Sequence, residues 1–148
     1  MISLRHVGLI VRDIDKSLHI YRDILNFKPK IDQIEHGPFF DHLIGFDNAK
    51  ARTTKCYAED ESCIELIQFI SHRSINREKR ILGLGFNHIA LNVENVDDVF
   101  KKLVSLGLQY VNEPKVNNEG TAKVSFCRDY EDNLLELVQL MKPVKVLK

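Results

Sequence analysis

The spacing of hydrophobic residues changes along the first part of the chain, and each change marks an expected element. Residues 3–11 are rich in aliphatic and β-branched side chains, which predicts a strand. Apolar residues then recur at helical spacing over residues 14–25, which predicts a helix. Asp13 or Asp15 can cap its start, and Asn26 can end it. The chain therefore begins with a strand followed by a helix.

The rest of the first half predicts extended structure with one irregular interruption. An extended piece is expected from Phe27, and residues 33–48 are less regular and are interrupted by glycine and proline. Two further strands are predicted at about 50–58 and 62–70, on either side of the polar turn AEDES. The charged segment 71–80 lacks periodicity and predicts a linker.

The same order of elements returns after the linker. Residues 85–93 predict a strand, and NVDDVFKKLVSLG predicts a helix that is capped by Gly107. Three extended pieces follow, near residues 109–113, 121–128 and 133–140. The second half therefore repeats the strand, helix and three strands of the first.

The residues repeat as well as the pattern. HVGLIVRDID, which begins at His6, aligns without gaps to HIALNVENVD, which begins at His88, and CIELIQF aligns to LLELVQL. Two matches in corresponding elements indicate an internal duplication. The sequence therefore predicts an α+β fold of two tandem βαβββ modules in a single domain. The expected bounds are about 1–72 for module one, 71–84 for the linker and 85–148 for module two, within a domain that spans residues 1–148.

Each aligned strand contains one glutamate within an apolar run. Glu65 lies in CIELIQF and Glu136 in LLELVQL, and an unpaired carboxylate in an apolar interior costs several kcal/mol or more. His6 and His88 lie in the first strand of each copy and are the expected partners. Two imidazoles and two carboxylates suit one divalent ion of nickel, cobalt, iron, manganese or zinc. The alternative is that these are ordinary structural histidines and surface glutamates.

Composition limits the partners. The 148 residues contain 21 Lys plus Arg and 21 Asp plus Glu, so a basic surface for nucleic acid or an anionic membrane is not expected. No apolar run reaches the length of a membrane helix, and no signal peptide is evident. The three cysteines, Cys56, Cys63 and Cys127, lack paired spacing, which favours a reducing, cytoplasmic location. The expected partner is a small-molecule substrate.

The motifs HVGLIVRDIDKSLHIYRDILNF, IELIQF, NHIALNVENVDD and VSFCRDYEDNLLELVQ resemble the vicinal oxygen chelate superfamily, which includes glyoxalase I and methylmalonyl-CoA epimerase. The resemblance covers nearly the whole chain. It implies a curved eight-stranded sheet around a metal site, often completed in a homodimer. By position, His6, Glu65, His88 and Glu136 match the four metal ligands of glyoxalase I.

This resemblance implies a metal-dependent lyase or isomerase that acts on a small α-oxygenated carbonyl compound. Proton abstraction would give an enediolate that the metal stabilises. Glu136 is the first candidate for the catalytic base, and Glu65 is the second. Substrate-binding residues are not identified by the sequence, although Gly8 and the matching Ala90 would leave room beside the metal. The alternatives are an iron-dependent extradiol-type dioxygenase and a non-catalytic protein of the bleomycin-resistance type that sequesters a ligand.

The sequence departs from the family patterns at three positions. Glyoxalase I has an arginine for glutathione where this chain has Ile10, which puts glutathione in doubt. Tyr130 and Glu131 replace the usual proline and aspartate before the last strand.

The linker cations Arg73, Arg77, Lys79 and Arg80 are expected to be solvated, and a clamp for an anionic substrate is the alternative.

Overall fold

The chain divides between Arg77 and Glu78 into two units, Met1–Arg77 and Glu78–Lys148. The structure is a computed structural model that describes residues 1–79 and 81–141. The division falls within the predicted linker, and the described residues between Phe69 and His88 contain no helix or strand. Each unit corresponds to one predicted module and is described by itself. Whether the modules form one domain remains a prediction.

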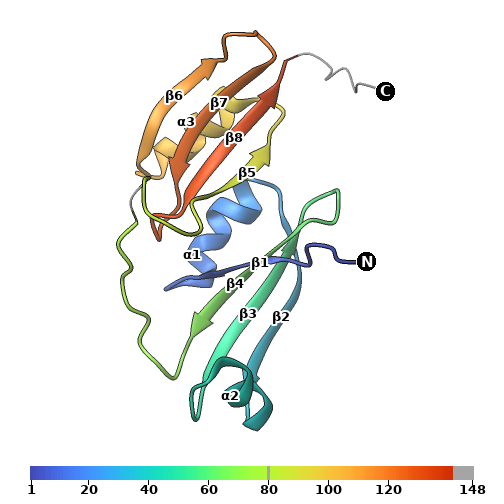
Figure 1. Cartoon of the computed structure of the whole chain (residues 1–148), viewed down its shortest axis with the longest axis vertical. Helices are drawn as coiled ribbons and strands as arrows, with labels where there is room; N and C mark the ends of the chain where they lie inside the picture. The colour runs from blue at the N-terminus through green and yellow to red at the C-terminus, as the bar shows by residue number, and fades with distance from the viewer. Residues whose placement is uncertain (80, 142–148) are drawn as a thin grey trace. The chain divides into compact units, whose positions relative to one another are not determined.

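Module one is a four-stranded sheet with a helix packed against it (Figure 1). The strand order is β1-β4-β3-β2, in which β1 runs parallel to β4 and the other neighbours are antiparallel. Its elements in chain order are β1 (Val7–Ile10), α1 (Ile14–Leu18), the π-helical turn η1 (His19–Ile24), β2 (Lys28–His36), α2 (Pro38–Ile44), β3 (Lys50–Tyr57) and β4 (Cys63–Phe69).

The first helix begins and ends where the sequence predicts. The Asp13 side chain caps α1 by accepting a hydrogen bond from the Lys16 backbone N–H at 3.0 Å. Gln68 at the end of β4 accepts a second one, from the Ile14 backbone N–H at 2.9 Å. Asn26 follows η1 with a φ of 60°, a left-handed conformation that stops the helix. The predicted cap and stop are confirmed.

Two expectations for module one need correction. The first strand was expected over residues 3–11 but begins at Val7. The irregular stretch at 33–48 contains the end of β2 and the short helix α2, which the sequence pattern does not predict. Pro38 supports the first turn of α2 and Gly45 ends it with a φ of 76°. The helix is too short for an apolar period to be visible in the sequence.

Module two repeats the arrangement without the extra helix. Its sheet has the order β5-β8-β7-β6, with β5 parallel to β8 (Figure 1). Asn95 caps the helix α3, Gln139 of the last strand accepts a hydrogen bond from the Val96 backbone N–H at 2.9 Å, and Gly107 follows with a φ of 79°. The elements are β5 (His88–Asn92), α3 (Val96–Ser105), β6 (Tyr110–Val116), β7 (Ala122–Arg128) and β8 (Leu134–Leu140).

Equivalent contacts in the two modules support the duplication. Gln68 and Gln139 hold the first turn of their own module's helix in the same way. Arg52 of β3 forms an ion pair with Asp15 of α1 at 3.0 Å, and Lys123 of β7 forms one with Asp97 of α3 at 2.6 Å. The α+β class and the two βαβββ modules are confirmed, with the eight strands arranged as two four-stranded sheets.

The core of each module lies between its sheet and its helix. Fully buried side chains on that side include Ile14, Tyr21 and Leu66 in module one and Val96, Leu103, Leu135 and Leu137 in module two. Strand side chains alternate between the two faces of a sheet, so Glu65 and Glu136, which lie next to these buried leucines, point to the opposite face. In the described residues, no helix is long and apolar enough to cross a membrane.

Candidate functional site

Module one brings its predicted histidine and glutamate together. His6 lies one residue before β1, and Gly8 pairs with Glu65 across the parallel β1–β4 ladder. The His6 Nε2 lies 3.0 Å from Glu65 Oε2, and the two side chains are 30% and 13% exposed. Both side chains of the pair are therefore partly buried.

Module two has the same pair in the same register. His88 is the first residue of β5, and Ala90 pairs with Glu136 in β8. The His88 Nε2 lies 3.1 Å from Glu136 Oε2. The structure thus places each predicted histidine beside the glutamate of its own module, which the sequence alignment of the two halves anticipates.

The spacing within each pair suits two ligands of one metal ion. Ligand atoms about 2.1 Å from an ion and at right angles to each other lie about 3.0 Å apart. Neutral imidazole and carboxylate are also the donors that manganese, iron, cobalt, nickel and zinc accept. Over residues 1–79 and 81–141, no three His, Cys, Asp or Glu side chains lie together as a metal cluster. Each module therefore presents a two-residue half-site.

The two half-sites have different neighbours, and the sequence did not predict this difference. Lys55 pairs with Glu65 across β3 and β4, and its Nζ lies 3.9 Å from Glu65 Oε1. In module two Phe126 pairs with Glu136 instead, and its ring meets the His88 ring edge-to-face with centroids 5.3 Å apart. The half-site of module one is therefore cationic on one side, and that of module two is aromatic.

A hydrogen-bond chain orients the imidazole of His88. The Asn87 side-chain amide donates from Nδ2 to the Ile81 carbonyl at 2.7 Å, so its Oδ1 faces His88. The His88 Nδ1 lies 2.7 Å from that oxygen and must carry the hydrogen. The Nε2 atom then faces Glu136. Metal-binding histidines usually have such a partner on the other ring nitrogen.

Gly8 and Cys63 lie close to the ligand pair of module one, whereas Cys127 is part of the core. Gly8 leaves space beside Glu65, because an added Cβ would meet its nearest neighbour, Ile67 Cδ1, at an ordinary 3.4 Å. Cys63 lies two residues before Glu65 and therefore on the same face of β4. Cys127 is only 1% exposed, and burial raises the pKa of its thiol, so it is a core residue and not a nucleophile.

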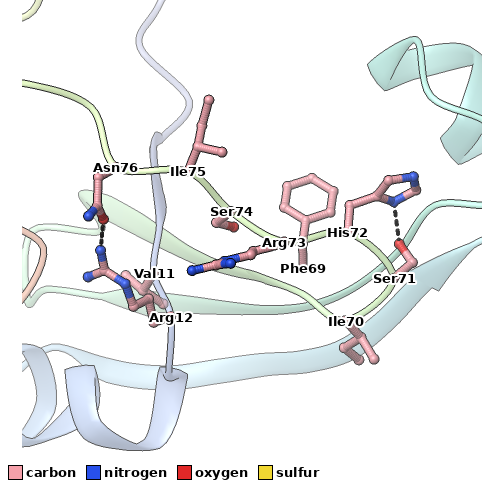
Figure 2. A pocket seen from close by; sticks show the side chains of 10 residues that line it. All are labelled: Val11, Arg12, Phe69, Ile70, Ser71, His72, Arg73, Ser74, Ile75 and Asn76. Atoms are coloured by element: carbon pink, nitrogen blue, oxygen red, sulfur yellow. Dashed lines mark hydrogen bonds between the residues drawn. The ribbon is translucent and has the colours of Figure 1, made fainter.

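A cleft of about 660 Å³ lies in module one, where β1 and β4 end (Figure 2). Arg12 and Arg73 both line it, and Arg12 donates a hydrogen bond to the Asn76 side chain. Lys79 instead bonds the Glu131 carbonyl and the Asn133 side chain. Among the linker cations, Arg73 therefore lines the cleft, Lys79 has a structural role, and Arg80 lies outside the described residues.

Comparisons with known proteins agree with the fold and with the family that the sequence motifs resemble. The family model for the Glyoxalase/Bleomycin resistance protein/Dioxygenase superfamily matches residues 3–137. A probable lactoylglutathione lyase from Synechocystis sp. is 32% identical over 138 residues, which is 92% of this chain and 94% of that protein. A lactoylglutathione lyase from Escherichia coli O157:H7 is 25% identical over 136 residues, 92% of this chain and 91% of that protein.

Solved structures show the same fold. A glyoxalase family protein from Bacillus cereus superposes with a TM-score of 0.88 at 19% identity and 96% coverage of both chains. The fosfomycin resistance protein FosX from Listeria monocytogenes, solved with Mn(II) and sulfate, gives 0.58 at 19% identity, with 98% of this chain and 97% of that chain covered. From its motifs, its fold and the family match, the chain belongs to the Glyoxalase/Bleomycin resistance protein/Dioxygenase superfamily.

Proposed function

We propose that this protein is a metal-dependent lyase or isomerase of the glyoxalase type, acting on a small α-oxygenated carbonyl compound. The observation that carries the proposal is the matched His–Glu pair in each module, with separations of 3.0 and 3.1 Å. The similarity to lactoylglutathione lyases over more than nine-tenths of the chain supports it.

His6, Glu65, His88 and Glu136 would together hold one divalent ion. Two carboxylates neutralise the charge of such an ion, and the neutral imidazoles complete a mixed nitrogen and oxygen ligand set. The Mn(II) in the solved FosX supports an ion of this class. When bound, the ion would polarise the substrate carbonyl and stabilise the negative charge that develops on its oxygen.

Glu136 is the better candidate for the catalytic base because the neighbours of the two glutamates differ. The Lys55 ammonium lies 3.9 Å from Glu65 Oε1 and attracts that carboxylate. Glu136 lies beside the uncharged ring of Phe126, and in the described residues no lysine or arginine forms an ion pair with it. Glu136 is therefore the first candidate for the base, and Glu65 is the second.

The proposed reaction is a proton transfer between neighbouring carbons. The Glu136 carboxylate accepts the α-proton, and the electron pair of the broken C–H bond forms a carbon–carbon double bond as the carbonyl oxygen becomes negatively charged. Glu136 then returns the proton to the former carbonyl carbon. The hydroxyl proton of the first carbon passes to the negatively charged oxygen, and a carbonyl forms at the first carbon. Atoms and charge balance without an external oxidant or reductant.

A glutathione adduct is not the proposed substrate, although the relatives are lactoylglutathione lyases. Ile10 stands where glyoxalase I has an arginine for glutathione, and its side chain is 54% exposed. A neutral, exposed side chain cannot supply the charge-assisted hydrogen bond that a glutathione carboxylate would accept.

We also propose a cytoplasmic homodimer. Large apolar side chains such as Ile10 and Ile31 are exposed in module one, and covering them favours association. The three cysteines are free and buried, which suits a reducing compartment. Analytical ultracentrifugation should give the mass of two chains; a single monomeric species at micromolar concentration would contradict the dimer.

Solvent exchange tests the reaction. Mn²⁺-loaded protein is incubated in D₂O with α-hydroxy and α-oxo carbonyl compounds, and deuterium at the α-carbon is followed by NMR. We expect exchange in the wild type, none in Glu136→Gln and partial exchange in Glu65→Gln. Oxygen consumption without exchange would indicate a dioxygenase. Tight binding without turnover or a metal requirement would indicate a sequestering protein, and either result would refute the proposal.

A further inference from the structure

Lys55 is a partly buried cation, and no anion among residues 1–79 and 81–141 is hydrogen-bonded to it. Its side chain is 19% exposed, and the carboxylate oxygen of its ion-pair partner, Glu65 Oε1, is 3.9 Å away, beyond the 3.2 Å limit of an ordinary N–H···O bond. An ammonium carries three N–H donors, and its burial is costly when they lack partners. Among the described residues, the only fully buried side-chain polar atom without a partner is Thr54 Oγ1, so Lys55 Nζ still contacts solvent.

The surroundings of Lys55 place these donors on the ligand side of the sheet. Lys55 is directly opposite Glu65 in the antiparallel β3–β4 ladder, and directly opposed side chains lie on the same face. Its neighbour on the other side is Ile31 of β2, which has no charge to offer. The ammonium is therefore next to the His6–Glu65 half-site and faces water.

The charge balance of the site leaves room for one further anion. Two ligand carboxylates and a divalent ion sum to zero, so Lys55 adds one uncompensated positive charge. The position that matches Lys55 in module two is Phe126, and no charge is added there. A substrate with a single negative group would restore neutrality.

We propose that Lys55 binds a carboxylate of the substrate, so that the substrate is an α-hydroxycarbonyl compound that also bears a carboxylate. This inference rests on the proposed function. The two vicinal oxygens would be held at the metal site, and the carboxylate would accept hydrogen bonds from Lys55 Nζ. Lys55 is thus a specificity-determining residue, whereas the bases and ligands remain Glu136, Glu65, His6 and His88.

A matched pair of probes tests this role. Hydroxypyruvate carries a carboxylate next to its α-hydroxy ketone, and dihydroxyacetone replaces that carboxylate with a neutral hydroxymethyl group. Binding of Mn²⁺, and then of each probe to the Mn²⁺-loaded protein, is measured by isothermal titration calorimetry. The variants are Lys55→Met, Lys55→Arg and the control Lys50→Met, which removes an exposed lysine from the same strand.

We expect Lys55→Met to weaken hydroxypyruvate binding by about tenfold to a hundredfold, the usual range for a lost charge-assisted hydrogen bond. The dissociation constants for dihydroxyacetone and for Mn²⁺ should change by less than about threefold in Lys55→Met. Lys55→Arg should restore most of the affinity for hydroxypyruvate, and Lys50→Met should match the wild type for both probes.

Three results would overturn the inference. The first is equal affinity for hydroxypyruvate in the wild type and Lys55→Met, or no binding by the Mn²⁺-loaded wild type. The second is a parallel loss of Mn²⁺ and both probes in Lys55→Met, which would mean that Lys55 only supports Glu65. The third is wild-type protein that binds none of manganese, iron, cobalt, nickel and zinc, which would remove the proposed function together with the inference; the first two leave the proposed function standing.

Discussion

Replacing Asn87 with alanine should weaken metal binding about tenfold while leaving the fold intact. Asn87 is exposed, and its amide links the Ile81 carbonyl to His88 Nδ1 through two contacts of 2.7 Å. Without this acceptor the imidazole can rotate, or place its hydrogen on the nitrogen that faces Glu136. Partners of metal-bound histidines typically contribute ten- to a hundredfold in affinity, or about 1.4 to 2.7 kcal/mol.

A tenfold loss of metal affinity, the lower end of that range, is expected because His88 keeps a second contact, with Phe126. The Phe126 ring still packs against the His88 ring, with centroids 5.3 Å apart, and limits its rotation. Mn²⁺ dissociation constants for the wild type and Asn87→Ala, measured by calorimetry, give the effect. The control is Arg5→Ala: Arg5 precedes His6 as Asn87 precedes His88, but in the described residues no hydrogen bond joins Arg5 to His6, whose Nε2 contacts Glu65.

Two results would refute this reasoning. An Asn87→Ala protein that binds Mn²⁺ as tightly as the wild type would mean that the orientation of His88 does not depend on Asn87. An equal loss in Arg5→Ala would mean that any change next to a ligand histidine has the same effect. Circular dichroism at the same temperature checks that both variants are folded.

Three further predictions follow from the two modules. Gly8→Ala should reduce turnover because the added methyl group narrows the space beside Glu65. Metal content and thermal stability should stay the same, because the added Cβ meets its nearest neighbour at 3.4 Å. A fall in metal content would contradict this prediction. Arg52 lowers the pKa of Asp32 by hydrogen bonding, so this pair should stabilise the fold above about pH 4 and lose that effect as the pH falls through the lowered pKa. Urea unfolding of Arg52→Met should show a loss below about 1 kcal/mol at pH 7 that disappears in acid, and a pH-independent loss would refute the assignment. Gln68→Ala and Gln139→Ala should each lower the free energy of unfolding by about 1 kcal/mol, and a large difference between them would argue against equivalent caps.

The strands, the main helices and the His–Glu pairs could be predicted because the duplication provides two independent copies of each signal. Glu65 and Glu136 are visible as charges in apolar strands, and His6 and His88 occupy the same alignment position. Their pairing within each module is observed, whereas their role as ligands of one ion remains a prediction.

The neighbours of the pairs could not be predicted, because they depend on strand register. Lys55 lies opposite Glu65 because the turn between β3 and β4 has five residues and a particular conformation. That conformation includes Glu61 in the left-handed region, with a φ of 65°. Asp132, with a φ of 60°, has the same place in module two and sets Phe126 opposite Glu136. Non-glycine residues rarely adopt this conformation, so the sequence does not reveal the register.

Asn87 and α2 were missed for a different reason. The role of Asn87 depends on a contact with Ile81, which lies in a segment without periodicity. α2 has only seven residues, and it is held in place when the Asp41 carboxylate accepts hydrogen bonds from the backbone N–H groups of Asn48 and Ala49. Neither feature leaves a repeating pattern in the sequence.

Metal content per chain tests the central claim most directly. Wild type and Glu65→Ala are purified without chelators or a metal-binding tag and are measured side by side by elemental mass spectrometry. The proposed four-residue site predicts about one equivalent of a divalent metal per chain in the wild type and a clear reduction in the variant. A wild type that holds no metal, even after reconstitution with manganese, iron, cobalt, nickel and zinc, would contradict it and would leave the two His–Glu pairs as structural ion pairs.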